Sequence, residues 1–204
     1  MTGAGLIFLD IDDVLCLGSP YGSPEAIEAL VGTHIDPDAV FRDLFAARTR
    51  EVLLRAHEEM HAEMGGALRY VISSTWREHF DREGIDAVFR RSGLGAIADQ
   101  PHEGDPWRTP ISTHRGQRAD EIAEWLRLHH GGEPFVIVDD TFSGTSLYAS
   151  VLGPSHPLTD RIVLCQEGVG LLAEHAGLIV DALRRPVDAG RRRSHRGYRR
   201  NRCG

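Results

Sequence analysis

The sequence contains no lysine, and all 23 of its basic residues are arginine. Any positive charge in a binding or catalytic site must therefore come from a guanidinium group, which is planar and can bind phosphate through two parallel hydrogen bonds. Acidic residues outnumber basic ones by 30 to 23. Seven of the arginines lie in 191–204, which has no acid, so the first 190 residues carry 16 basic and 30 acidic groups.

Long apolar runs and cysteine are also scarce. No basic segment is followed by a long apolar stretch, so we expect neither a signal peptide nor a membrane span. The three cysteines, Cys16, Cys165 and Cys203, form no paired framework, which favours reduced thiols in a cytoplasmic protein. Nothing in the composition indicates an obligate protein partner.

The length and the hydrophobic share suit one domain with a full core. The chain has 204 residues, of which 41% are hydrophobic. We predict a single domain over 1–186 and a basic, disordered tail over 187–204. Within the domain, 17–48 is predicted to be a Gly- and Pro-rich loop insertion with one short helix.

Helical patterns alternate along the chain with short β-branched runs, which is typical of an α/β fold. Continuous apolar runs indicate strands that are covered on both faces. We therefore predict a Rossmann-like parallel sheet of about five strands with helices on both faces. The expected strands are 6–9, 70–72, 135–138, 162–164 and, more weakly, 96–98. The expected helices are 49–64, 81–92, 118–130 and 171–183.

Paired acidic residues follow two of the expected strands. Asp10 and Asp12 come just after the first, and Asp139 and Asp140 come just after "FVIV". Ligands of parallel sheets gather at the carboxyl ends of strands, so both pairs are expected at one edge. Converging carboxylates repel one another, and a hard cation such as Mg²⁺ resolves this with a few carboxylate oxygens, water and phosphate. The alternative is that each pair only caps the following helix or turn.

These segments resemble the motifs of the haloacid dehalogenase (HAD) superfamily. "DIDDV" is similar to its first motif, "YVISS" to its second and "FVIVDD" to its fourth, and they occur in the family's order. The third motif is a Lys or Arg at the start of the helix before the last of these strands. Arg118, which opens "RADEIAEWL", and Arg115 in the preceding loop both fit this place. The resemblance implies the HAD fold and a phosphatase.

The family's roles carry over to the matching acids. Asp10 would be the nucleophile that takes the phosphoryl group as an aspartyl-phosphate. Asp12 would protonate the leaving oxygen and then activate water, and its backbone carbonyl would also ligate Mg²⁺. Asp140 would ligate the metal directly, with Asp139 beside it. The expected metal site therefore consists of Asp10, Asp12, Asp139 and Asp140.

The same resemblance assigns the groups that hold the phosphate. Ser73 would hydrogen-bond the phosphoryl oxygens, with Ser74 as the second choice. Arg118 or Arg115 would neutralise the charge that develops during transfer. An ordinary strand-end hydroxyl and a solvated surface arginine are the alternatives.

The sequence departs from the common family pattern in two places. Many members use Lys in the third motif, which this chain lacks, and many have a further acid three to five residues after the fourth motif. Here "DDTFSG" has none, and the next acid is Asp160. Asp13 has no family role, and we expect it to cap the loop behind the site.

One helix carries a competing signal. "HEEMH" at 57–61 matches His-Glu-x-x-His, the zinc-protease pattern, with His57 and His61 on one helix face. A protease would need a third ligand in an open site, and nothing in the sequence identifies one. The five-residue pattern arises easily by chance among 11 histidines. We therefore prefer an amphipathic helix with histidines at its flank.

The substrate is indicated by the small insertion and by a closer resemblance. The short 17–48 segment predicts a minimal cap and an open site. "VISSTWR", "RADEIAEWL" and "FVIVDD" are similar to the HAD domains of Swiss Army Knife RNA-repair proteins, which implies removal of phosphate from a nucleotide or RNA end. Trp76 and Arg77 would then stack on and pair with a nucleotide, or Trp76 would simply pack at a helix start.

The resulting prediction is a Mg²⁺-dependent phosphatase that acts on phosphomonoesters. One alternative is a nucleic-acid-binding module that uses the Arg-rich tail on a HAD scaffold. Another is a phosphotransferase or a dehalogenase on the same fold. A dehalogenase would have little use for Asp12 and the metal.

Overall fold

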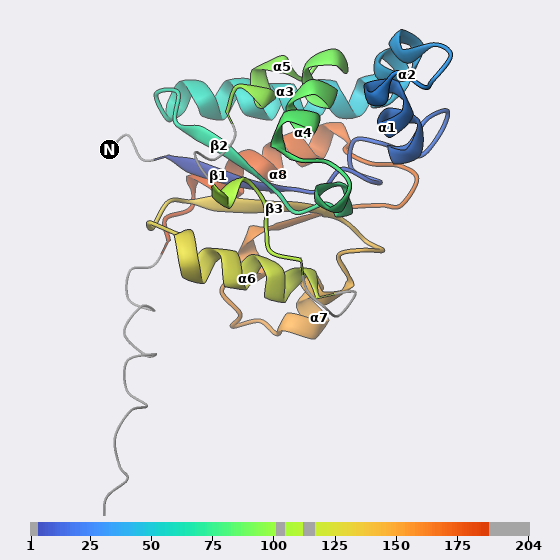
Figure 1. Ribbon diagram of the computed structural model, residues 1–204. Coiled ribbons are helices and arrows are strands. Elements are labelled where there is room, and N and C mark those ends of the chain that lie inside the picture. The colour runs from blue at the N-terminus through green and yellow to red at the C-terminus, as the bar shows by residue number, and fades with distance from the viewer. Residues whose placement is uncertain (1–3, 101–104, 112–116, 188–204) are drawn as a thin grey trace, which may run out of the picture.

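The computed structural model describes residues 4–100, 105–111 and 117–187, and its centre is a four-stranded parallel sheet (Figure 1). The strand order is β2-β1-β3-β4. The strands are β1 (Gly5–Leu9), β2 (Leu68–Ile72), β3 (Phe135–Asp140) and β4 (Ile162–Cys165). The predicted α/β fold with a parallel, Rossmann-like sheet is confirmed.

The fifth strand, predicted weakly at 96–98, is wrong. This segment forms the short helix α5 (Gly95–Ala98), in which the Ala98 N–H donates to the Leu94 carbonyl at 3.1 Å. Ile97 and Ala98 are buried in the core beside helix α4 (Arg82–Arg91). A short apolar run has no period of its own, so burial alone does not distinguish a strand from one turn of helix.

The sheet is apolar on both faces because successive side chains of a strand point in opposite directions. In β1, Ile7 and Leu9 belong to the larger core, whereas Leu6 and Phe8 belong to the smaller one on the other face. All five residues of the strand are buried. The continuous apolar run seen in the sequence is therefore the signature of a central strand covered on both sides.

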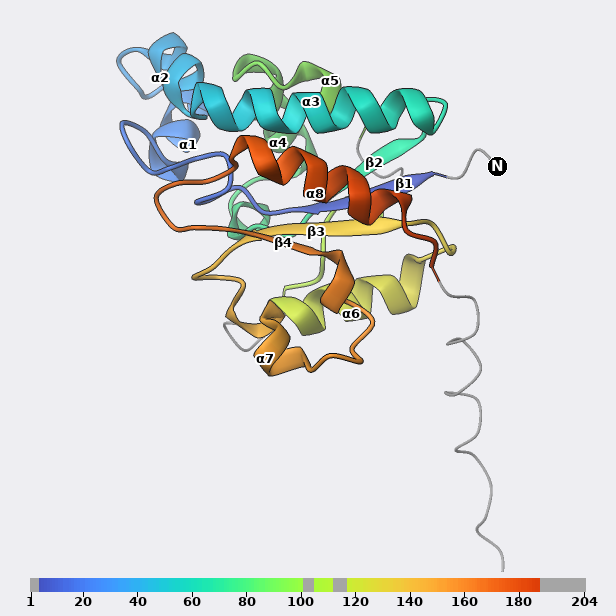
Figure 2. The same ribbon diagram turned by 180° about the vertical axis from the view of Figure 1, so that it is seen from behind.

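Helices cover both faces of the sheet (Figures 1 and 2). One face carries α3 (Ala47–Glu63), α4, α5 and α8 (Ala173–Arg184), and the other carries α6 (Arg118–His129) and α7 (Ala149–Leu152). The four predicted helices are confirmed to within a few residues. Single 3₁₀ turns lie at η1 (Thr75–Glu78), η2 (Asp105–Trp107), η3 (Thr145–Leu147) and η4 (Thr159–Arg161).

The insertion at 17–48 holds two short helices where one was predicted. They are α1 (Ser23–Val31) and α2 (Pro37–Asp43), and both begin with Pro at their first turn. The Asp36 side chain caps α2 by accepting from the Ala39 N–H at 3.0 Å. Both helices bury apolar residues in the larger core, so the insertion packs as part of the domain.

Two of the three cysteines, Cys16 and Cys165, are buried free thiols, and Cys203 lies outside the described residues. The predicted basic tail also lies outside them, apart from Val187 at its start. Among the residues that the structure describes, no helix has the length and apolar character needed to span a membrane.

Candidate active site

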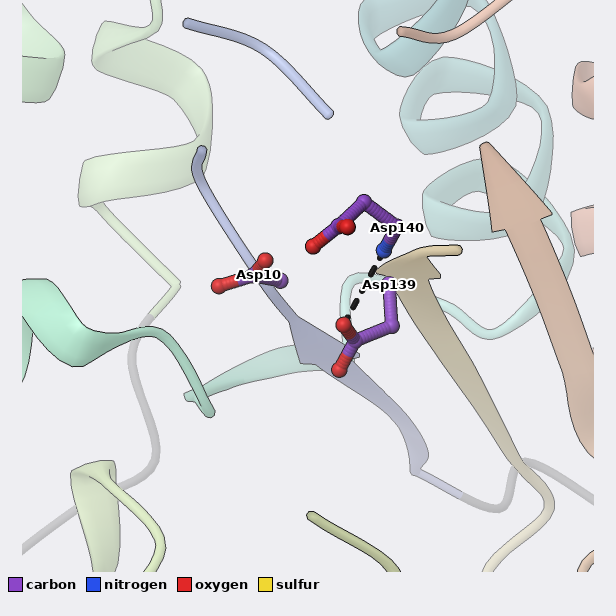
Figure 3. Close-up of side chains that lie close together, drawn as sticks. All are labelled: Asp10, Asp139 and Asp140. Atoms are coloured by element: carbon purple, nitrogen blue, oxygen red, sulfur yellow. Dashed lines mark hydrogen bonds between the residues drawn. The ribbon is translucent and has the colours of Figure 1, made fainter. Parts of the chain in front are cut away.

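Three buried carboxylates meet at the carboxyl edge of the sheet. Asp10 follows β1, and Asp139 and Asp140 end β3 (Figure 3). One oxygen of each carboxylate lies within 4.8 Å of an oxygen of the other two. Their exposed fractions are 1%, 0% and 3%. The predicted convergence of the two strand ends is therefore observed for three of the four predicted acids, although Asp10 and Asp139 are 129 positions apart in the chain.

Strand pairing brings the three acids together. Leu9 of β1 is in register with Val138 of β3, and the Asp10 N–H donates to the Val138 carbonyl at 2.9 Å. Asp10, the first residue after β1, therefore lies beside Asp139, which is still paired with Leu164 of β4. The Asp140 N–H donates to Asp139 Oδ1 at 3.0 Å, which fixes the two neighbouring carboxylates relative to each other (Figure 3).

Two of the three carboxyls have raised pKa values. Burial raises the pKa of Asp10 well above its usual range, and the Asp139 carboxylate raises it further, against the opposing charge of Arg118. Burial likewise raises the pKa of Asp139 to about 6, although Arg118 acts in the opposite direction. A few closely spaced carboxylate oxygens, completed by water and substrate phosphate, are the donors that Mg²⁺ takes in proteins. The residues present therefore fit a hard divalent cation.

Arg118, the first residue of α6, is the cation in this cluster. Its side chain is 5% exposed, and its Nε lies 2.8 Å from Asp139 Oδ2. Its Nη2 lies 3.5 Å from Asp10 Oδ1, and its Nη1 lies 3.4 Å from Glu121 Oε2. The structure thus brings Arg118 to two of the three carboxylates, Asp10 and Asp139. The other predicted choice, Arg115, lies outside the described residues.

Asp12 lies beside the three carboxylates and has a different environment. Its Oδ1 accepts a hydrogen bond from the Trp76 Nε1–H at 2.8 Å, and its Oδ2 accepts from the Thr75 hydroxyl at 3.4 Å. Burial raises the pKa of the Asp12 carboxyl, whereas the Trp76 hydrogen bond lowers it. The Asp12 side chain is outside the group of three that lie within ligand distance of one another.

Trp76 is fully buried, so the predicted stacking on a nucleotide is wrong for this side chain. Its ring stacks on Phe80 with centroids 5.3 Å apart and lies 6.3 Å from the Phe45 ring. The alternative reading, packing at a helix start, is confirmed. Its indole N–H is the polar end of a core side chain, and it orients Asp12.

Arg77 is also buried, at 2% exposure, and its guanidinium is used within the protein. It donates to the carbonyls of Ser73 and Ser74 and pairs with Glu121 at 2.7 Å. Pairing of Arg77 with a nucleotide is therefore not supported. Because Glu121 also contacts Arg118, the two buried arginines share one carboxylate.

The two serines after β2 have different surroundings. The Ser74 side chain hydrogen-bonds Asp10, which lowers the pKa of that carboxyl. The Ser73 hydroxyl is buried and has no hydrogen-bond partner among the described residues. The structure therefore places Ser74, the second choice from sequence, in contact with the predicted nucleophile.

Ser143 was missed by sequence reasoning. Its hydroxyl donates to Asp139 Oδ1 at 3.0 Å and lies 3.3 Å from Asp10 Oδ2, and it also contacts Asp140. One hydroxyl has one proton to donate, so it cannot satisfy three carboxylates at once. Its position, three residues after Asp140, is where many HAD members carry a further acid, and that departure was the available signal.

Asp13 caps the loop behind the site, which confirms its expected structural part. Its Oδ1 accepts from the Gly168 N–H at 2.7 Å, in the loop that follows β4. Its φ of +53° is in the left-handed region, which Asp and Asn tolerate better than most residues.

The zinc-protease pattern forms no comparable site. His57 is buried, and its Nδ1 lies 3.1 Å from the Tyr70 hydroxyl, while the His57 and His61 ring centroids are 5.0 Å apart. Among the described residues, Asp10, Asp139 and Asp140 are the only group of three side chains that could share a metal ion. The flanking histidines of an amphipathic helix account for the pattern.

Comparison with known proteins agrees with this arrangement. The model of the family described as the HAD domain in Swiss Army Knife RNA repair proteins matches residues 6–176. Neither the search of curated proteins nor the search of solved structures found a match. The matched segment runs from the first strand into α8 and contains Asp10, Arg118 and Asp140. The chain therefore belongs to the family of HAD domains found in Swiss Army Knife RNA repair proteins.

Proposed function

We propose that this protein is a Mg²⁺-dependent phosphatase that hydrolyses phosphomonoesters on nucleotide or RNA ends through an aspartyl-phosphate. The observation that carries the proposal is the convergence of Asp10, Asp139 and Asp140 within 4.8 Å, with Arg118 against two of them. Membership of an RNA-repair HAD family supports the substrate class.

In the proposed reaction Asp10 is the nucleophile. One of its carboxylate oxygens bonds to phosphorus while the bond from phosphorus to the ester oxygen breaks. Asp12 gives its proton to the departing oxygen, so an alcohol leaves. Asp12 then takes a proton from water, which attacks phosphorus and releases inorganic phosphate together with the restored Asp10 carboxylate.

The pKa shift of Asp12 suits this double role. Burial raises its pKa, which helps it hold a proton until the ester oxygen departs. The Trp76 Nε1–H fixes one oxygen at 2.8 Å, and the other oxygen, which accepts from the Thr75 hydroxyl at 3.4 Å, would carry the proton. Trp76 is therefore a positioning residue that acts through Asp12.

Charge on the transferring group would be met by the surrounding donors. Arg118 supplies a positive charge, and Ser74 supplies a hydroxyl next to Asp10. Mg²⁺ would be held by Asp10, Asp139 and Asp140, and when bound it would offset the repulsion among them and the charge of the phosphate. Burial of the cluster strengthens these interactions, because little water competes inside it.

The direct test is a substrate screen of purified protein with Mg²⁺ against nucleotides, sugar phosphates and RNAs that carry 3′- or 5′-phosphates. We expect release of phosphate from nucleotide or RNA ends, and loss of activity in Asp10→Asn, in Asp12→Ala and after metal removal. Asp13→Asn is the matched control, because its side chain caps a loop outside the carboxylate cluster. Full activity in Asp10→Asn would overturn the mechanism.

Deletion of 188–204 separates the phosphatase from the nucleic-acid-binding module. The phosphatase keeps turnover of small substrates without the basic tail, whereas the binding module loses RNA affinity and shows no turnover with or without it. Addition of an alcohol acceptor distinguishes a phosphotransferase, in which a new phosphoester would form in place of inorganic phosphate.

A further inference from the structure

Phe142 is an exposed aromatic residue in the turn directly after the carboxylates of β3. It is 74% exposed, and it lies two residues after Asp140, in the turn that follows β3. Among the described residues it is the only aromatic one of the large apolar side chains that are exposed. Solvent exposure of a phenyl ring gives no packing benefit, so core stability does not account for this residue.

The turn that carries Phe142 is fixed by the site itself. The Phe142 N–H donates to Asp140 Oδ1 at 2.6 Å, and the Ser143 N–H donates to the same oxygen at 2.9 Å. The Gly144 N–H closes the turn on the Asp140 carbonyl at 3.0 Å. A side chain at position 144 would place its Cβ 2.5 Å from that carbonyl oxygen, so the turn requires glycine there.

These bonds hold the backbone of Phe142 beside the carboxylate cluster. The Phe142 nitrogen lies 2.6 Å from a carboxylate whose oxygen is within 4.8 Å of Asp10. A phosphoryl group bound at Asp10 would therefore lie close to the backbone segment that carries the Phe142 ring. In a nucleotide, one sugar separates the base from the phosphate. In Phe142, one methylene group separates the ring from the backbone.

We propose that Phe142 is the platform on which the nucleobase next to the terminal phosphate stacks; this rests on the proposed phosphatase function. The platform takes the part that sequence reasoning gave to Trp76, whose ring is buried. Stacking on one aromatic face accepts every base, because all bases present a π-face. The site therefore selects base-bearing phosphoesters over abasic ones and shows little preference among the four bases.

The test compares substrates with and without a base. The wild-type protein and Phe142→Ala are assayed with Mg²⁺ on adenosine 5′-monophosphate and on ribose 5-phosphate. We expect the ratio of kcat/KM values, nucleotide over sugar phosphate, to fall about 5- to 150-fold in the variant, which is the range for loss of one base–aromatic stack. The change should reside in KM for the nucleotide, because stacking is the same before and during phosphoryl transfer.

Conservative replacements separate stacking from bulk. Phe142→Trp should keep the ratio near the wild-type value, whereas Phe142→Leu, which is apolar without a π-face, should behave like Phe142→Ala. The backbone N–H that bonds Asp140 is present in every one of these variants. Leu128→Ala is the matched control: this side chain is 54% exposed on α6, ten residues and about 15 Å of helix beyond Arg118.

A second pair of substrates identifies the source of the base. A short oligoribonucleotide with a terminal phosphate is compared with one whose terminal nucleotide is abasic. If Phe142→Ala lowers the kcat/KM ratio of base-bearing over abasic substrate for the oligonucleotide pair alone, the platform is assigned to RNA ends. If the variant lowers this ratio for both pairs, the platform is assigned to terminal nucleotides in general. An unchanged ratio on both pairs, with hydrolysis intact, overturns the platform, whereas absence of all phosphate release overturns the phosphatase.

Discussion

Replacement of Asp10 by Asn should abolish activity and at the same time stabilise the metal-free protein. The change removes one negative charge from three buried carboxylates and keeps the size of the side chain. An amide can accept from Ser143 and Ser74 and can donate to the neighbouring carboxylates. Activity should fall at least about 10⁴-fold, since the nucleophile is lost.

The magnitude follows from the distances. The carboxylate oxygens lie within 4.8 Å of one another, and two unit charges at that limit repel by about 3.5 kcal/mol at an effective dielectric constant near 20; Asp10 has two such neighbours. Its attraction to Arg118 at 3.5 Å offsets about 5 kcal/mol of this. The net gain on neutralising Asp10 is about 2 kcal/mol, which raises Tm by about 4–8 °C in a chain of this size.

The assay is thermal unfolding at pH 8 in the presence of a chelator and again with excess Mg²⁺. The wild type should gain Tm when the metal is added, because binding to the folded state stabilises it. Asp10→Asn should gain less from Mg²⁺, since one ligand has lost its charge. Asp13→Asn serves as control, because Asn keeps the oxygen that accepts from Gly168 and tolerates the left-handed φ at that position.

A lower metal-free Tm in Asp10→Asn would refute the electrostatic reasoning, provided that Asp13→Asn unfolds like the wild type. It would mean that the hydrogen bonds of the Asp10 carboxylate outweigh the repulsion from Asp139 and Asp140. Equal gains on adding Mg²⁺ in the wild type and in Asp10→Asn would exclude Asp10 as a ligand.

Three further changes test other parts of the site and the fold. Trp76→Phe removes the 2.8 Å hydrogen bond to Asp12, so kcat with Mg²⁺ should fall about 10- to 100-fold with KM for a small phosphate nearly unchanged. Arg118→Met leaves Asp139 without its buried partner, and urea unfolding should show a loss of about 3–5 kcal/mol. Burial and the neighbouring His61 lower the pKa of His57, so its unfolded form binds more protons. The wild type should therefore lose stability relative to His57→Gln as the pH falls below about 6.5, measured as the difference in Tm between the two proteins.

Periodicity and strand-end chemistry were sufficient to predict most of the fold. The β-branched runs around Ile7 and Ile137 are long enough to be read as buried strands, and α3 and α6 show helical spacing over three turns or more. The strand prediction at 96–98 was wrong because three residues are too few to show a period. The second helix of the insertion was missed because its start at Pro37 was read as loop.

The sequence by itself determined which strands end in acidic residues and which motifs of the family are present, because both depend on residues close together in the chain. Only the tertiary structure decided which atoms meet. The register of β1 with β3 puts Asp10 beside Asp139, and core packing turns Trp76 inward to hold Asp12. The tertiary structure also places the Ser143 hydroxyl, which was not predicted, among the carboxylates. These contacts join distant segments, and local sequence carries no record of the distances between them.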